Sequence, residues 1–284
     1  QFCHATGTTA HTAGLDNFHN AFASIYEGRY LAGIAAGMKL NEMIADGEFT
    51  EDEAKIGYVG AYTYAEVISG YTSFYLGAKS VCPSVTMEVQ FTGSWYDETA
   101  EKEAANTLIG RDCKLISQHA DSMGAPTACE SAGVPNVSYN GSTVSACPNT
   151  FIVSSKIDWA PYFEYIVNCV ANGETIAADW CKGTGEGSVV LTELNDIVAA
   201  EGTAEAIAEA EEKLVSGDLH VFDTTTFTVD GAALDSYMAD VDTDADYTPD
   251  TEVISDGYFH ESEMRSAPYF DLRIDGITTL NEMF

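Results

Sequence analysis

The sequence predicts an α/β protein with a doubly wound lobe at its centre and a second lobe built from the two flanks of the chain. From Lys55 to Gly173, strand-like segments alternate with helical ones. Strands separated by helices of this length form βαβ units, whose right-handed crossovers make the strands parallel. The flanks carry further strands and helices. We therefore expect one lobe over residues 55–175, and an incomplete first lobe with a C-terminal tail over residues 1–54 and 176–284.

Five strands and four helices are expected in the central lobe. The strands are the apolar or alternating segments Lys55–Ala61, Val85–Phe91, Lys114–Ala120, Val134–Asn140 and Thr150–Ser155. The helices are expected over Tyr64–Val81, Asp97–Ile109, Gly124–Ala132 and Asp158–Gly173. The first helix has apolar residues at helical spacing, the second has acids in its first turn, and the last ends at a glycine. This order predicts a five-stranded parallel sheet with helices on both faces.

The flanks have a less regular pattern. Before the central lobe, QFCHATG is strand-like, TTAHTAGLD is loop-like and Asn17–Ala45 is one long helical pattern. Gly33 and Gly37 stand in GxxxG spacing, which in a helix outside a membrane predicts close helix packing. After the central lobe come the strand SVVLTEL, the helix GTAEAIAEAEEKLVSG and a hairpin-like pair, LHVFDTTTFTVDG.

We expect the helix Asn17–Ala45 and the segment after Ser188 to pack together as the remnant of the incomplete lobe. Burying an apolar side chain contributes about 1.5–3 kcal/mol, so the apolar face of this helix should be covered. That face consists of Phe22, Ile25, Leu31 and Ile34. If strands of the lobe are missing, part of the face would be bare, and the chain made alone is expected to be poorly soluble, dimeric or partly unfolded.

The charge of the chain excludes some classes of partner. Its 284 residues carry 45 acidic and 12 basic side chains, for a formal net charge of −33. Such a surface repels phosphate backbones, so no nucleic acid partner is expected. It suits the solvated surface of a halophile's protein as well as ordinary secreted acidity. No apolar run reaches the roughly 18 residues that a membrane helix requires.

The seven cysteines include no CxxC pair, which argues against a zinc ribbon or a thioredoxin-like motif. Cys169 with Cys181, and Cys129 with Cys147, could form disulfides, or all could be free buried thiols. The acidic run Asp240–Asp250 resembles a calcium loop but has Ala245 where the sharp-turn glycine belongs and no closing glutamate. A solvated acidic loop is the better interpretation, and no metal or cofactor is expected.

The polar turn HADSMG, from His119 to Gly124, raises the question of catalysis. A catalytic triad draws its members from distant parts of a chain, whereas neighbours in one turn rarely aim at one another. The chain has no GxSxG motif, and its GTGEG run lacks the Lys-Ser/Thr of a phosphate loop. We expect no enzyme activity and interpret His119 as a hydrogen-bonded strand-end histidine.

Aromatic residues gather where the predicted strands end. Trp95 and Tyr96 follow one strand, Tyr62 and Tyr64 another, and Tyr139 a third. In parallel sheets ligands bind at the carboxyl ends of the strands. These aromatic side chains suit a planar heterocycle or a sugar, although packing between the lobes would also account for them.

Six segments, in order, resemble the basic membrane protein family. They are EGRYLAGIAAG, KIGYVGA, TGSWYDETAEKEAA, QHADSMGAP, VPNVSYN and FIVSSKIDW. The resemblance covers Gln1 to Leu194 and implies a type I periplasmic-binding-protein fold, with two doubly wound α/β lobes joined by a hinge. Its members are substrate-binding lipoproteins of ABC transporters, typified by purine-nucleoside binders. The resemblance also implies a segment before Gln1 that would complete the first lobe.

The same resemblance implies roles for individual residues. Trp95 matches the aromatic that stacks on the base, and Asn140 stands where nucleoside binders place an aspartate for the ribose hydroxyls. The segment with Lys156 and Asp158 matches a strand end where the family often has a lysine, and Asn17 matches an asparagine of the first lobe. The expected ligand-binding residues are Asn17, Trp95, Tyr96, Asp121, Ser122, Gly124, Tyr139, Asn140, Lys156 and Asp158.

The expected function is that of the substrate-binding component of an ABC importer. It would capture a small solute, with a purine nucleoside preferred, by lobe closure and pass it to a permease. The resemblance implies an extracytoplasmic location, periplasmic or at the cell surface, with membrane contact only through a lipid anchor on a segment before Gln1. The alternatives are an enzyme or a sugar-type sensor on the same fold, or a fragment without a ligand site of its own.

Overall fold

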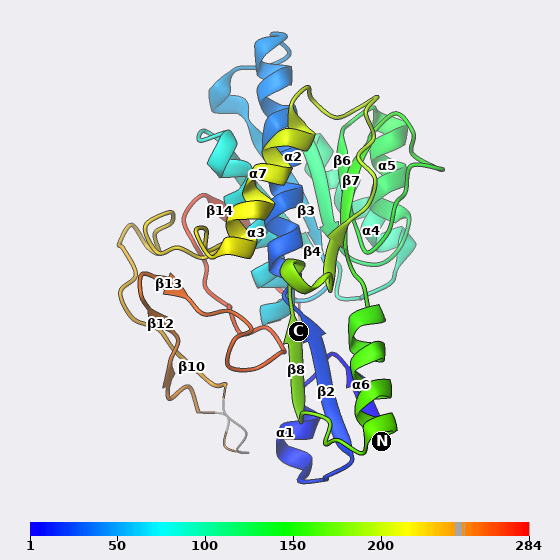
Figure 1. Cartoon of the computed structure of the whole chain (residues 1–284). Coiled ribbons are helices and arrows are strands. Elements are labelled where there is room, and N and C mark those ends of the chain that lie inside the picture. The colour runs from blue at the N-terminus through cyan, green and yellow to red at the C-terminus, as the bar shows by residue number, and fades with distance from the viewer. Residues whose placement is uncertain (242–245, 247, 284) are drawn as a thin grey trace.

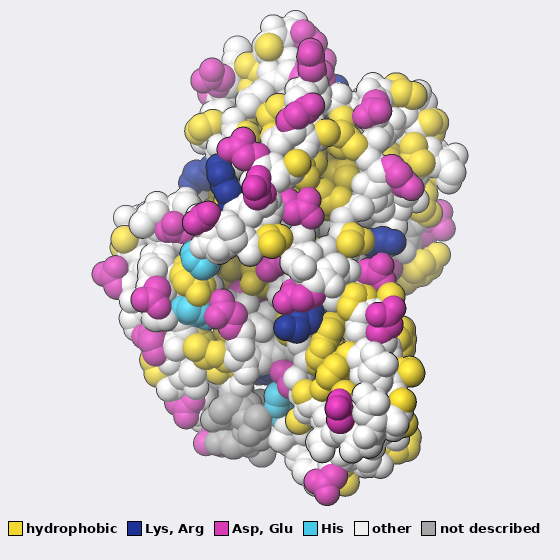
Figure 2. Space-filling model, viewed as in Figure 1, with side chains coloured by type: hydrophobic (Ala, Val, Ile, Leu, Met, Phe, Trp, Pro, Cys, Tyr) yellow, Lys and Arg dark blue, Asp and Glu magenta, His cyan; other side chains and the backbone are white. Residues whose placement is uncertain are grey.

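The computed structural model describes residues 1–241, 246 and 248–283, and these residues build two sheets. The larger sheet has seven strands in the order β14-β4-β3-β5-β6-β7-β9, and the smaller has three in the order β1-β2-β8. The smaller sheet lies beyond one end of the larger, so that the two form separate lobes (Figure 1). Acidic side chains are scattered over the face shown in Figure 2, where Lys and Arg are few.

The larger sheet contains all five strands that the alternation predicts. Its members are β3 (Lys55–Gly60), β4 (Thr86–Phe91), β5 (Leu115–His119), β6 (Asn136–Tyr139), β7 (Phe151–Ile157), β9 (Val189–Leu191) and β14 (Ile277–Thr279). Every neighbouring pair is parallel except β7 with β9. The prediction of a five-stranded parallel sheet over Lys55–Gly173 is confirmed, and β9 and β14 extend it at its two edges.

Helices cover both faces of this sheet. On one face lie α2 (Ile25–Ala45), α3 (Ala65–Val81) and α7 (Thr203–Ser216), and on the other α4 (Glu98–Gly110) and α5 (Gly124–Ala132). The contact between α2 and α3 has no room for side chains at its glycines. A Cβ on Gly33 would lie 2.1 Å from the Phe74 carbonyl oxygen, and one on Gly77 would lie 2.0 Å from that of Tyr30. The close packing predicted from the GxxxG spacing is therefore present.

The smaller sheet is parallel throughout. It consists of β1 (Phe2–Ala5), β2 (Phe18–Ala23) and β8 (Asp179–Lys182), with the short helix α1 (Thr9–Ala13) and the helix α6 (Ala160–Asn172) beside it. The chain passes between the two lobes after β2, after β7 and after β8. Three crossings of this kind form the hinge of a two-lobed binding protein.

The first flank differs from its sequence-based prediction. Residues Phe18–Ala23, expected to begin a long helix, form β2, because this segment is buried between β1 and β8 and strand pairing overrides its helical pattern. The helix that follows, α2, packs on α3 over the larger sheet. The boundary expected at residue 54 placed residues 25–45 in the first, smaller lobe. In the structure these residues belong to the larger lobe instead.

The apolar side chains of this flank are covered. Phe22, Ile25, Leu31 and Ile34 are all buried, so the bare patch expected there is absent. The helix α7 and strand β9 do contact α2, but on the larger lobe. Exposed apolar side chains are found instead on α6, at Phe163, Val167 and Val170.

The remaining chain is a long tail with little regular structure. The predicted hairpin in LHVFDTTTFTVDG is absent, because this segment folds into turns with isolated bridges. Short two-stranded pairs follow: β10 (Met238–Ala239) with β11 (Thr251–Glu252), and β12 (Ile254–Ser255) with β13 (Tyr258–Phe259). Of the acidic run Asp240–Asp250, interpreted above as a solvated loop, residues 242–245 and 247 lie outside the described residues. A stack of phenylalanine rings holds the tail, with Phe222 and Phe270 centred 4.2 Å apart.

The seven cysteine thiols are all free, so neither of the two possible disulfides forms. None of the helices within the described parts of the chain is both long and apolar enough for a bilayer crossing.

The tail buries one carboxyl group, Glu261. Its Oε2 accepts the backbone N–H groups of Tyr269 and Phe270 at 3.1 and 2.9 Å. Burial raises the pKa of Glu261 from 4.5 to about 7, against the lowering effect of these hydrogen bonds. The protonated form is therefore favoured in the folded state relative to the unfolded one.

We expect Glu261→Gln to remove a pH dependence of stability. A group whose pKa is higher in the folded state than in the unfolded state contributes its full stabilisation at pH values below the unfolded-state pKa. This contribution is lost as the pH rises through the folded-state pKa. Above pH 7 the charged side chain should lower the free energy of unfolding of the wild type by on the order of 3 kcal/mol relative to that of the variant. Below pH 4.5 the two proteins should have similar free energies of unfolding. Denaturant unfolding at several pH values measures this difference, and a constant gap between the two proteins would contradict it.

Candidate binding site

A cavity of about 540 Å³ lies between the two lobes. The smaller lobe contributes Thr6 and Phe22, from the ends of β1 and β2. The larger lobe contributes residues at or after the carboxyl ends of its strands: Glu66, Trp95, Asp121, Tyr139, Asn140, Ile157 and Trp159. The carboxyl edges of two parallel sheets thus face one shared space, the usual place for a ligand in open α/β sheets.

Aromatic rings form much of the wall. Trp95 follows β4, and Tyr62 meets it edge-on with ring centroids 5.6 Å apart. Tyr62 in turn stacks on Tyr64 at 5.0 Å. On the other side, Tyr139 lies 4.1 Å from the ring of His119. Large flat faces held in this way can bind a planar partner at little entropic cost.

Backbone hydrogen bonds fix the loops that carry these rings. The amide of Asp121 donates to the Trp95 carbonyl at 2.8 Å, and that of Asn140 donates to the Ser155 carbonyl at 2.9 Å. Asn140 has a left-handed φ of 62°, which asparagine tolerates better than most residues. Its Nδ2 donates to Oδ1 of Asp121 at 3.2 Å, so these two exposed side chains act as one polar unit.

The charged groups at the cavity are both acidic. Glu66 and Asp121 line it, whereas no Lys or Arg does so among the residues that the structure describes. Nε2 of His119 lies 3.8 Å from Oε1 of Glu66. Burial lowers the pKa of His119 and outweighs the opposing effect of the Glu66 carboxylate, so the imidazole is neutral at ordinary pH. The cavity therefore favours neutral or cationic ligands.

A fully buried arginine lies behind the cavity wall. Nη1 of Arg29 donates to the Ser138 carbonyl at 3.2 Å and to Oγ of Ser155 at 3.3 Å. Nη2 donates to Tyr58 Oη at 3.2 Å and to Oγ of Ser117 at 2.6 Å. These four partners lie on β6, β7, β3 and β5, so one helix side chain joins four strands.

The same guanidinium lies against aromatic faces. Its Cζ is 4.7 Å from the ring centroid of Phe74, 5.4 Å from that of Tyr58 and 5.6 Å from that of Tyr139. None of the ion pairs among the described residues includes Arg29, so hydrogen bonds and π faces alone compensate its charge. Tyr139 is held between Arg29 and His119 and is thereby fixed in the wall.

Four of the ten expected ligand-binding residues line the cavity: Trp95, Asp121, Tyr139 and Asn140. Asn17 lies at the opposite end of β2 from Phe22 and is distant from the cavity. Tyr96 points to solvent with 67% of its surface exposed. The remaining expected residues, Ser122, Gly124, Lys156 and Asp158, lie near the lining residues without belonging to them.

Three of these neighbours have structural contacts of their own. The amide of Ser122 donates to the buried carboxylate of Glu101, and its Oγ accepts the amide of Gly124 at 3.1 Å. Asp158 accepts the amide of Ala160 at 2.9 Å, where α6 begins. Lys156 is half-buried in β7, and its neighbour Ile157 lines the cavity in its place.

Five lining residues escaped the sequence analysis: Thr6, Phe22, Glu66, Ile157 and Trp159. Glu66 is the last residue of GAYTYAE, the turn that follows the first central strand. Its place at the cavity could therefore have been predicted from its position after a strand end. Phe22 was assigned to a helix, and this error concealed its place at a strand end. Ile157 and Trp159 both lie within FIVSSKIDW, a segment that carries the resemblance, beside the expected residues Lys156 and Asp158.

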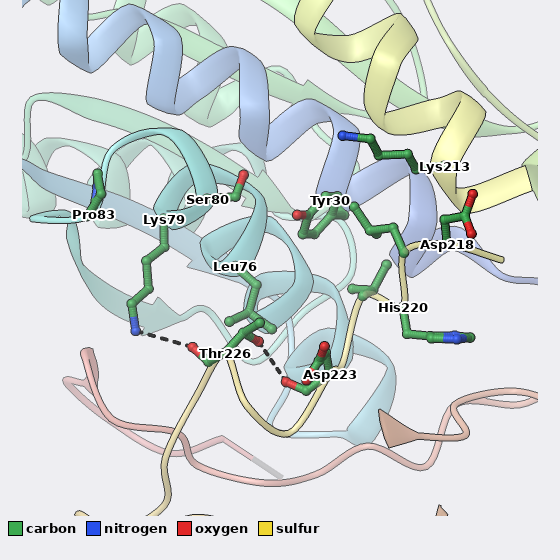
Figure 3. Close-up of a pocket in the computed structure, with 12 residues that line it drawn as sticks. Tyr30, Leu76, Lys79, Ser80, Pro83, Lys213, Asp218, His220, Asp223 and Thr226 are labelled. Carbon is green, nitrogen blue, oxygen red and sulfur yellow. Dashed lines mark hydrogen bonds between the residues drawn. The ribbon is translucent and has the colours of Figure 1, made fainter. Parts of the chain in front are cut away.

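A second cavity of about 620 Å³ lies on the outer side of the larger lobe, between α3, α7 and the tail (Figure 3). Leu76 and Lys79 come from α3, and Lys213 from α7. Its two lysines are accompanied by Asp218 and Asp223, and Lys79 donates to the Thr226 carbonyl at 3.5 Å. Its lining comes from helices and the tail, whereas the cavity between the lobes is lined at the strand ends.

Comparisons with known proteins show the family to which the chain belongs. A family model described as ABC transporter substrate-binding protein PnrA-like matches residues 1–221. A putative ABC transporter glucose-binding protein of Haloferax volcanii is 31% identical over 226 residues, which is 80% of this chain and 54% of that protein. A purine-binding protein of Brucella abortus is 29% identical over 222 residues, 78% of this chain and 59% of that protein.

A solved solute-binding protein of an ABC transporter from Conexibacter woesei has the same fold. Its TM-score is 0.59 at 21% identity, over 78% of this chain and 70% of that one. Two parallel sheets whose strand ends face one cavity define a type I periplasmic-binding fold. The chain belongs to the family of PnrA-like substrate-binding proteins of ABC transporters. It spans a little over half the length of the two sequence relatives.

We expect Gly124→Ala to lower stability without changing the ligand-binding wall. A Cβ there would lie 2.3 Å from the Glu98 carbonyl oxygen and 2.9 Å from Cβ of Glu101, so α5 must move away from α4. Overpacking of this kind costs about 1–3 kcal/mol. Denaturant unfolding would measure the loss. If stability were retained while ligand affinity fell, Gly124 would belong to the binding site after all.

Proposed function

We propose that this chain binds a purine nucleoside in the cavity between its lobes and presents it to the permease of an ABC importer. The observation that supports this most strongly is the aromatic wall at the cavity, with Trp95 after β4 and Tyr139 at the end of β6 each held by contacts with further rings. Stacking on such faces contributes about 1–3 kcal/mol per base. The relative described as a purine-binding protein supports the same solute class.

The polar unit of Asp121 and Asn140 suits the sugar of a nucleoside. The Asp121 carboxylate retains acceptor capacity beyond its bond from Asn140, and a ribose hydroxyl can donate to it. Glu66 offers a second acceptor across the cavity. The ligand would enter between open lobes and be enclosed as they rotate about the three crossings.

A hexose is the second candidate. Carboxylate and amide groups beside aromatic rings also suit a sugar, and the relative from Haloferax volcanii is described as a putative glucose-binding protein. Under either proposal the protein binds its ligand and does not transform it. It would work outside the cytoplasmic membrane, in a periplasm or tethered to the cell surface by a lipid anchor on a preceding segment.

Trp95→Ala should weaken adenosine binding by about 1–3 kcal/mol, because the base loses its stacking partner. Tyr96→Ala provides the matched control, since this neighbouring aromatic side chain is 67% exposed and outside the cavity. Isothermal titration calorimetry with adenosine and guanosine would measure both. Equal affinities for the wild type and Trp95→Ala would remove Trp95 from the site, and binding of glucose in place of the nucleosides would favour the second candidate.

The charge of the cavity predicts discrimination against phosphorylated ligands. At 4 Å, two like charges repel by about 1–4 kcal/mol across the range from water to a protein surface, so adenosine monophosphate should bind at least about fivefold more weakly than adenosine. Asp121→Asn and Glu66→Gln should each narrow that ratio, because each removes one negative charge. Competition measurements at low salt test this, and a preference for the nucleotide would contradict it.

A further inference from the structure

The tail after residue 221 lies beyond the part of the chain that the family model matches. It nevertheless contacts both lobes. One of its segments reaches β8 of the smaller sheet, and another adds β14 to the edge of the larger sheet. A single stretch of chain that is bonded to two lobes restricts how they move relative to each other.

The contact with the smaller lobe is made at Ser266. Its amide donates to Oδ2 of Asp179 at 2.6 Å, and its hydroxyl donates to the other oxygen of the same carboxylate. Asp179 is the first residue of β8, and Nε2 of His11 lies 3.3 Å from it. Ser266 is itself 2% exposed, so water competes poorly for these bonds.

The contact with the larger lobe begins four residues later. Phe270 is completely buried and stacks on Phe222, whose ring also meets that of Tyr26 on α2 at 5.4 Å. Arg273 donates from Nη1 to Tyr71 Oη on α3.

The end of the tail is bonded to the edge of the larger sheet. Gly276 accepts the amide of Met87, and Asn281 pairs with both the N–H and the C=O of Phe91 at 2.8 and 2.9 Å. Met283 exchanges hydrogen bonds with Thr63, near the loops of the cavity.

Only a short stretch of chain separates the attachment at Ser266 from the one at Phe270. Four residues span at most about 14 Å when fully extended, so Ser266 cannot move far from Phe270. The chain crosses between the lobes at Gly183, after β8, and Asp179 lies four residues earlier at the start of that strand. At the rise of a β-strand, Asp179 is therefore about 13 Å from the crossing. A lobe rotation of about 15° would then move Asp179 by roughly 3 Å, enough to break both bonds to Ser266.

We propose that the pairing of Ser266 with Asp179 is a latch that holds the two lobes together in the absence of ligand. The tail would thereby set the balance between open and closed lobes. An effect of this balance on solute capture rests on the proposed function. The latch itself is a property of the protein without ligand. Loss of the latch shifts the population toward open lobes. The apparent ligand affinity then falls in proportion to the remaining fraction of closed molecules.

The test is an interlobe distance measured without ligand. Spin labels on unnatural amino acids at Leu15 and Ile197 leave the native cysteines untouched, and these exposed residues lie on the smaller and the larger lobe. We expect Asp179→Ala to broaden the distance distribution and lengthen it by at least about 3 Å, the displacement derived above. Asp16→Ala, which removes an exposed carboxylate from the same lobe, should match the wild type.

Ser266→Ala separates the latch from the contact of Asp179 with His11, because it removes one donor to the carboxylate and leaves the histidine in place. It should give an intermediate change, and it replaces Asp179→Ala if that variant does not fold. Distributions of folded variants that superimpose on the wild type would overturn the latch. Because no nucleoside is present, this outcome is independent of whether the proposed ligand is correct.

Discussion

The buried guanidinium of Arg29 is the interaction on which the arrangement of this protein depends. Taking an isolated charge out of water costs several kcal/mol even after the surroundings relax. Here four hydrogen bonds and three aromatic faces compensate that cost, with no carboxylate partner among the described residues. The compensation works only if α2 lies in one position over β3, β5, β6 and β7. The charge thus specifies the packing of the helix that leads directly out of the smaller lobe.

That position determines what faces the cavity. Because β2 ends at Ala23 and α2 begins at Ile25, fixing the helix also fixes the end of β2 and the side chain of Phe22. On the other side of the cavity, Arg29 and His119 hold Tyr139 between them. One buried residue therefore supports both walls, which explains how a cavity between two lobes can have rigid aromatic surfaces.

Much of the larger lobe could be predicted from sequence because local patterns and tertiary structure agree there. Between residues 55 and 173 its strands alternate with helices that have clear starts and stops, so these elements could be predicted from their own residues, whereas the edge strand β14 could not. The smaller lobe could not be predicted in the same way. The β2 segment carries a helical pattern and becomes a strand only because β1 and β8 pair with it, and β8 is distant in sequence.

The candidate site was predictable where a residue follows a strand, as for Trp95, Asp121 and Asn140. It was not predictable where a role depends on three-dimensional packing. Nothing in the sequence shows that Arg29 lies beneath Tyr139, or that Ser266 meets Asp179 across 87 positions of the chain. The first contact is set by the packing of α2 on the sheet, and the second by the return of the tail over both lobes.

A crystal structure of the protein grown with adenosine tests the central claim most directly. The account predicts a base lying against Trp95 in the cavity between the lobes, with the ribose near Asp121 and Asn140, and lobes no further apart than they are here. Adenosine bound only in the outer cavity beside Lys79 and His220, or an empty cavity between the lobes at saturating ligand, would contradict it.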